Sequence, residues 1–148
     1  MSPVIVAEPI SSPRLMLSTR LVYELGDPHS TLRATTDRYG AAVLINAGGE
    51  IDACNEHTWR HLVSEAASVV TLPGPLVVDV SGLDFMGGCA FAVLAEEAER
   101  CRRRGIELRL VSRQNIVARI VDACGLGGLL PIYPTADSAL AMTGSLVS

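Results

Sequence analysis

The sequence has few aromatic residues, no long apolar run and no surplus of basic charge. Aromatic side chains make up 4% of the 148 residues, so the core must be built from Val, Leu, Ile and Ala. No apolar run approaches the roughly 20 residues that a membrane-spanning helix requires. The net charge of -4 argues against general nucleic-acid binding, which needs a basic face. The 49% of apolar residues nevertheless suffices for one folded domain.

The chain also lacks the patterns that are typical of secreted proteins. Cys54, Cys89, Cys101 and Cys124 show no C-x-x-C spacing, which predicts free thiols rather than a disulfide framework. Residues 1–10 have no basic segment, and prolines interrupt their short apolar run, so no signal peptide is predicted. We therefore expect a cytoplasmic protein.

Residues 1–30 differ from the rest of the chain because prolines and serines punctuate them. We predict an N-terminal extension over residues 1–30, partly ordered or docked on a folded domain that spans residues 31–148. Residues 15–25 are expected to form a strand or a short helix. Two roles stay open for the extension: it covers a binding site, or it joins two copies of the chain in a homodimer.

Hydrophobic periodicity predicts that strands and helices alternate in the folded domain. Strands are expected at residues 32–37, 41–47, 76–80, 106–111 and 132–133. Helices are expected from near Asp52 and over residues 89–104, 114–124 and 135–142. Residues 48–52 are expected to leave the sheet, and residues 81–88 to form a turn. The predicted fold is α/β, a mixed four- to five-stranded sheet with helices mainly on one face.

The segment 76–105 combines a buried strand, a turn with a Gly-Gly pair and a helix that ends at Gly105. This order places the unpaired N–H groups of the helix N-terminus beside the end of the strand. Such a place suits an anion, a phosphorylated side chain or a carboxylate of a partner. Cys89 stands there, and no hydroxyl does.

Three stretches resemble the STAS domain: GEIDA at 49–53, VVDVSGLDFM at 77–86, and a Gly-ended helix that leads into IELRLVS at 106–112. STAS domains form bacterial anti-sigma factor antagonists and the cytoplasmic tails of sulfate transporters. The resemblance covers roughly residues 32–145 and implies that 31–148 is a STAS domain. It also implies binding to an anti-sigma factor that is a serine kinase. That kinase inactivates family antagonists by phosphorylating a Ser or Thr at the start of the helix after the third strand, which adds ~2 negative charges.

At that helix start the chain departs from the family pattern. The family reads Phe-Met-Asp-Ser-Ser/Thr-Gly-Leu, whereas residues 85–91 read FMGGCAF. Gly87 replaces the Asp, Gly88 replaces the acceptor Ser, and Cys89 replaces the neighbouring Ser or Thr. The resemblance therefore implies that the chain has no phosphoacceptor and escapes the kinase. Ser81 lies too early in the chain to substitute for it.

We interpret the chain as a STAS regulatory protein of the anti-sigma factor antagonist type, which works by binding and has neither catalysis nor a cofactor. Its partner would be a serine-kinase-type anti-sigma factor or a related regulatory protein. The alternative is a degenerate STAS scaffold or a subunit of a sensory complex, with a redox switch at Cys89. The predicted partner-binding residues are Glu50, Asp52, Gly87, Gly88, Cys89 and Ala90.

Cysteine and histidine provide the other candidates for chemistry. A thiol at a helix N-terminus becomes reactive where its pKa is lowered, so Cys89 is either a redox switch or a small residue that fills a turn. Cys101 and Cys124 fall on apolar helix faces and are expected in the core; the second shares its face with Ile116.

A metal site and a catalytic nucleophile are both weighed and rejected. Cys54, His57 and His61 share a helix face, but the first and last are about 10 Å apart along the axis, which argues against one shared metal ion. Cys89 after Gly88 resembles a nucleophile elbow whose second glycine is missing, so no enzyme is predicted.

Overall fold

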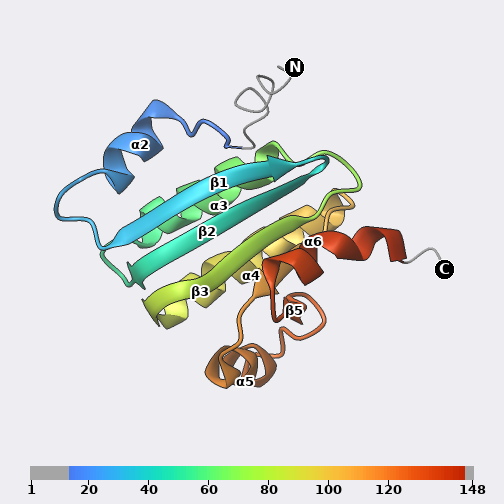
Figure 1. Ribbon diagram of the computed structural model, residues 1–148. Helices are drawn as coiled ribbons and strands as arrows, with labels where there is room; N and C mark the ends of the chain where they lie inside the picture. The colour runs from blue at the N-terminus through green and yellow to red at the C-terminus, as the bar shows by residue number, and fades with distance from the viewer. Residues whose placement is uncertain (1–13, 146–148) are drawn as a thin grey trace, which may run out of the picture.

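The computed structural model describes residues 14–145 (Figure 1). The first part of the predicted extension, residues 1–13, lies outside the described residues. The strands are β1 (Leu32–Tyr39), β2 (Ala42–Ile51), β3 (Leu76–Met86), β4 (Leu108–Val111) and β5 (Ile132–Tyr133). The helices are α2 (Thr19–Leu25), α3 (Glu56–Ser68), α4 (Gly88–Arg103), α5 (Asn115–Ala123) and α6 (Ala136–Ser145).

The five strands form one mixed sheet in the order β1-β2-β3-β4-β5. β1 and β2 are antiparallel and are joined through Gly40, whose φ of 64° is a left-handed conformation that suits glycine. The other neighbours are parallel, and a helix connects each parallel pair, since parallel strands need a long crossover. The predicted mixed α/β sheet is confirmed, with five strands.

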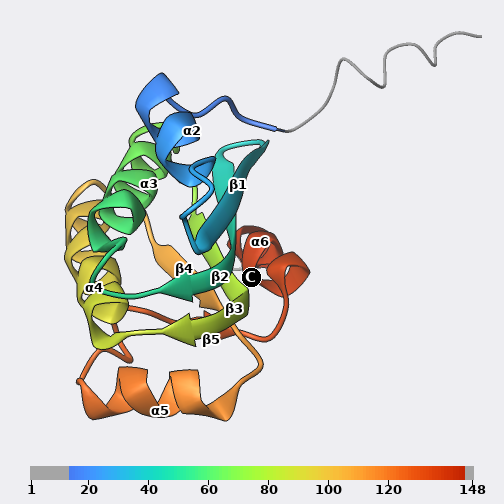
Figure 2. The same cartoon turned by 90° about the vertical axis from the view of Figure 1, so that its left-hand side faces the viewer.

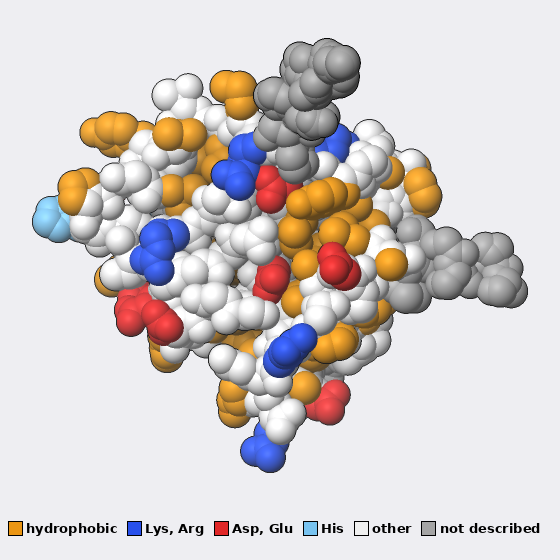
Figure 3. Space-filling model, viewed as in Figure 1, with side chains coloured by type: hydrophobic (Ala, Val, Ile, Leu, Met, Phe, Trp, Pro, Cys, Tyr) orange, Lys and Arg blue, Asp and Glu red, His pale blue; other side chains and the backbone are white. Residues whose placement is uncertain are grey.

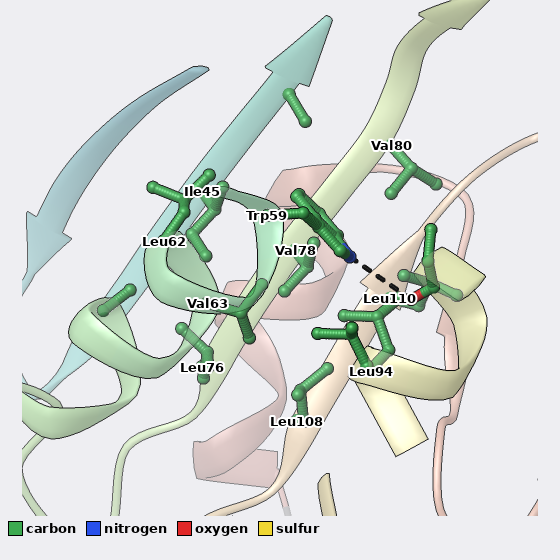
Figure 4. Packing of buried hydrophobic residues seen from close by; sticks show 14 of the residues in the cluster. Ile45, Trp59, Leu62, Val63, Leu76, Val78, Val80, Leu94, Leu108 and Leu110 are labelled. Carbon is green, nitrogen blue, oxygen red and sulfur yellow. Dashed lines mark hydrogen bonds between the residues drawn. The ribbon is translucent and has the colours of Figure 1, made fainter. Parts of the chain in front are cut away.

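Helices cover both faces of the sheet, but unequally. α3 and α4 lie together on one face, and α6 packs on the other (Figure 2). The larger core lies beneath α3 and α4, where Trp59 and Leu94 pack with Ile45 and Val78 (Figure 4). α6 covers a smaller cluster around Ala139. In Figure 3 hydrophobic side chains gather toward α6, and the rest of that sheet face is mostly polar.

β2 and β3 continue further than the sequence predicts. Residues 48–51 stay in the sheet and pair with residues 82–86, so the predictions of a sheet exit and of a turn are wrong. Two shifts of register allow the pairing to continue. A Cβ at Gly82 would lie 2.9 Å from the carbonyl oxygen of Ala47. Glycine therefore permits a close strand contact here rather than ending the strand, because it has no Cβ.

α3 begins at Glu56, later than the predicted start near Asp52. Asp52 does not cap the helix; its carboxylate accepts a hydrogen bond from the backbone N–H of Cys54 at 2.9 Å. Asn55 occupies the N-cap position instead. The residues between β2 and α3 thus form a short loop that keeps Asp52 beside the end of β2.

Residues 14–30 hold α2 against α3 and β1. Leu21 is fully buried, and the hydroxyl of Thr58 donates to the Glu24 carboxylate at 3.1 Å. The backbone N–H of Leu15 donates to the Thr36 carbonyl of the edge strand at 2.9 Å. The described part of the extension therefore shields the β1 edge, while the domain boundary at residue 30 stays a prediction.

Candidate functional site

The sequence-predicted binding residues lie at the carboxyl ends of β2 and β3, where both arrows end on the left in Figure 1. The strand register pairs Glu50 with Phe85 and Ile51 with Met86. The N–H of Gly87 then donates to the Ile51 carbonyl at 2.9 Å. This bond joins the start of α4 to the end of β2, so one end of the sheet carries both predicted segments.

Asn55 holds the loop that follows β2. Its side-chain oxygen accepts from the backbone N–H of Asp52 at 3.0 Å, and its amide nitrogen donates to the Glu50 carbonyl at 2.9 Å. The same nitrogen donates to the hydroxyl of Thr31 at 3.2 Å. Sequence reasoning missed Asn55, although Asn is a preferred residue before a helix and gave a usable signal.

Trp59 of α3 holds the first turn of α4 through a hydrogen bond. Its fully buried indole N–H donates to the Ala90 carbonyl at 3.2 Å (Figure 4). The sequence placed Trp59 in the core but not at the site. A buried indole N–H needs an acceptor, which is the signal that could have linked it to a second element. This hydrogen bond anchors the first turn of α4 to α3, directly after residues 87–88, which we call the glycine loop.

The glycine loop itself leaves room for side chains. Gly87 is the N-cap of α4 with φ −70°, and Gly88 is the exposed first residue of the helix. A Cβ at Gly88 would meet no atom within 4 Å, and one at Gly87 would lie 3.4 Å from the nearest atom. Neither position requires glycine for its backbone conformation, and no side chain caps the helix.

The cysteines occupy different environments. Cys89 is half-buried beside the glycine loop. Burial raises the pKa of the Cys101 thiol, and the nearby Glu97 carboxylate acts in the same direction, as expected of a core residue. Cys124 is exposed, so its predicted place in the core is wrong. The reason is that α5 buries only Val117 and Val121, and Cys124 follows its last turn as the C-cap residue.

The described residues offer no other obvious chemistry. Cys54 and His57 are exposed, and nowhere between residues 14 and 145 do three or more His, Cys, Asp or Glu side chains group in a way that could hold a metal ion. Across that same range, no helix has the length and apolarity that crossing a bilayer requires.

An apolar groove of about 300 Å³ adjoins the glycine loop. It lies between the carboxyl end of β3 and α5, and Phe85, Met86 and Ile116 are among its lining residues. Sequence reasoning missed this groove, because the segment before Gly87 was expected to be a turn.

Comparison with known protein families assigns the chain that carries this strand–loop–helix site to one of them. A model of the STAS domain matches residues 33–139 of the chain. The chain belongs to the STAS domain family. A Mycobacterium tuberculosis STAS relative, Rv2638, provisionally named an anti-anti-sigma factor, is 72% identical over 137 residues, or 93% of this chain and 92% of the relative. The anti-sigma-F factor antagonist RsfA of the same species is 60% identical over 114 residues, or 77% of this chain and 89% of RsfA.

Solved STAS structures share the fold. An anti-sigma factor antagonist from Mycobacterium paratuberculosis superposes with a TM-score of 0.58 at 24% identity, over 78% of this chain and 95% of that one. The antagonist SpoIIAA in its unphosphorylated form superposes with a TM-score of 0.59 at 17% identity, over 72% and 91%. At such identities the likeness concerns the fold alone.

Proposed function

We propose that this STAS protein is an anti-sigma factor antagonist that acts by binding an anti-sigma factor of the serine-kinase type. The 60% identity to RsfA, over 89% of RsfA, carries the proposal. The predicted binding residues lie together at one end of the sheet, which supports it further: Glu50, Asp52, Gly87, Gly88, Cys89 and Ala90. The proposed place of action is the cytoplasm, without catalysis or a cofactor.

The second part of the proposal is that the chain is not switched off by phosphorylation at the start of α4. Gly88 offers no hydroxyl, and Cys89 follows it. The open space around the Gly88 position supports this part, since a Cβ there would meet no atom within 4 Å and the backbone does not demand glycine. The missing acceptor is then a chemical difference and not a steric necessity of the loop.

Binding to purified anti-sigma factors of the source organism, beginning with its anti-sigma-F factor, tests the proposal. We expect one factor to bind with a dissociation constant in the micromolar range or below, measured by isothermal calorimetry. Glu50→Arg should weaken that binding, because Glu50 is exposed at the end of β2 and forms no ion pair within residues 14–145. If no factor binds at micromolar concentration, the proposal fails.

A scaffold that has lost kinase recognition is the second candidate, and the missing hydroxyl at Gly88 favours it. Combining Gly87→Asp with Gly88→Ser separates the two candidates. Phosphorylation of this double variant by the cognate kinase would mean that the recognition surface is intact, as expected of an antagonist. A double variant that folds but accepts no phosphate would favour the scaffold.

A further inference from the structure

The apolar groove beside the glycine loop has two exposed large hydrophobic side chains among its lining residues. Phe85 is 51% exposed and Ile116 is 53% exposed, although both are large hydrophobic side chains. They come from β3 and α5, and both line the groove. Exposed apolar residues that line one hollow are typical of a protein-binding surface rather than of chance exposure.

The groove is continuous with the proposed binding site. Phe85 and Met86 directly precede Gly87, and Phe85 is the strand partner of Glu50. A protein that contacts the glycine loop therefore reaches the groove without crossing an intervening surface. Met86 links the two, because it lies at the end of β3 and also lines the groove.

Charge at the groove favours a basic partner. Asp84 is the one charged residue among those that line the groove, and it is exposed. Neither Asp84 nor Glu50 forms an ion pair with another described residue. Exposed carboxylates beside an apolar hollow are complementary to a surface that presents an apolar side chain next to Arg or Lys.

We infer that this groove is part of the anti-sigma factor interface, where it receives an aliphatic or aromatic side chain of the factor, with a basic residue of the factor beside Asp84. The inference rests on the proposed function and names the contact that would give much of the affinity. A few buried anchor residues dominate most protein interfaces, and Phe85 and Ile116 would be anchors here.

Ile116→Ala tests the inference, because Ile116 lies on α5, outside the glycine loop and its neighbouring strand ends. The probe is the purified anti-sigma factor that binds the wild-type chain, beginning with the anti-sigma-F factor. We expect Ile116→Ala and Phe85→Ala each to weaken binding about tenfold, the loss typical of a truncated anchor. Both residues are exposed, so thermal unfolding should change little.

Val22→Ala is the matched control. Val22 is 56% exposed, and its helix α2 lies on the opposite side of the molecule from α5 (Figures 1 and 2). Its affinity should equal that of the wild type. If Ile116→Ala binds as the wild type does, the groove inference is overturned while the proposed function stands. If no factor binds the wild type, both fall.

A second copy of the chain is the other candidate to occupy the groove, and sedimentation velocity of the chain alone tests for it. We expect the same sedimentation coefficient for the wild type and Ile116→Ala at every concentration. A wild-type dimer that Ile116→Ala dissociates would assign the groove to a second copy of the chain, and would overturn the inference.

Discussion

Two glycine pairs lie at neighbouring strand ends, and the structure constrains them differently. Gly49 in β2 has a φ of 90°, and a Cβ there would lie 1.9 Å from the Thr31 carbonyl oxygen. Gly88 at the start of α4 has no positive φ, and its Cβ would meet nothing within 4 Å. The backbone thus requires glycine at residue 49 but not at residue 88. The backbone conformation and the space around residue 88 therefore give no structural reason for a glycine at that position.

Gly49→Ala should have the largest effect on stability. The added Cβ would clash with the Thr31 carbonyl and force a side chain into a left-handed conformation, so we expect a loss of about 3 kcal/mol in the free energy of unfolding. Gly40→Ala is the control, because Gly40 has a φ of 64° but open space around its Cβ. It should lose about 1 kcal/mol. Equal losses in urea unfolding would contradict the clash at Gly49.

Trp59→Phe should affect both stability and binding. It removes the donor to the Ala90 carbonyl and part of the core volume, which we expect to cost about 2 kcal/mol of stability. Affinity for the anti-sigma factor should fall as well, since the first turn of α4 loses its support. Val77→Ala, which removes volume from the separate cluster beneath α6 and should lose about 2 kcal/mol, is the control. If both variants keep full affinity, the support from Trp59 does not matter for binding.

Gly88→Ala should separate binding from stability. The methyl group enters open space at the first position of a helix, so the free energy of unfolding should stay equal or rise by up to about 1 kcal/mol. Affinity should fall about tenfold, because the partner can no longer approach the backbone closely. Gly128→Ala, also in open space but in the hollow lined by Arg102 and Gly105 at the other end of α4, should leave affinity unchanged. A Gly88→Ala variant with wild-type affinity would place the contact elsewhere.

Cys89→Ala should have the smallest effect. We expect the affinity of Cys89→Ala to stay within about twofold of the wild type in both reducing buffer and peroxide, because a half-buried thiol in the first turn of α4 contributes little. Calorimetry under the two conditions measures this. A wild-type chain that loses affinity in peroxide, while Cys89→Ala does not, would establish the redox switch instead.

Local sequence predicted the elements of this fold better than their ends. Considered alone, residues 48–49 indicate an exit from the sheet, and residues 81–82 indicate a turn. Only the pairing of β2 with β3 keeps these four residues in strands. Periodicity placed Ile116 and Cys124 on the apolar face of α5, but could not show that these two members of the face would stay exposed. Helical phase specifies which residues share a face, whereas the neighbouring elements decide whether that face is buried.

In the candidate site, too, the sequence predicted the segments but not the contacts between them. The STAS resemblance located Glu50 and Gly87, and the structure brings their segments together through the bond from Gly87 to Ile51. Trp59 acts on a residue 31 positions away, so no local pattern reveals its contact. Asn55 bonds to residues three and five positions before it, and its preference for the position before a helix was a local signal that went unused. The groove between β3 and α5 likewise exists only once both elements are packed.

The affinity of the unmodified chain for its kinase-type anti-sigma factor, before and after incubation with that factor and ATP, is the most direct test. We predict the same dissociation constant in both samples and no phosphate on the chain by mass spectrometry. A Gly88→Ser variant should gain a phosphate and then bind more weakly than the same variant before incubation. A wild-type chain that gains a phosphate and then no longer binds would contradict constitutive binding through the glycine loop.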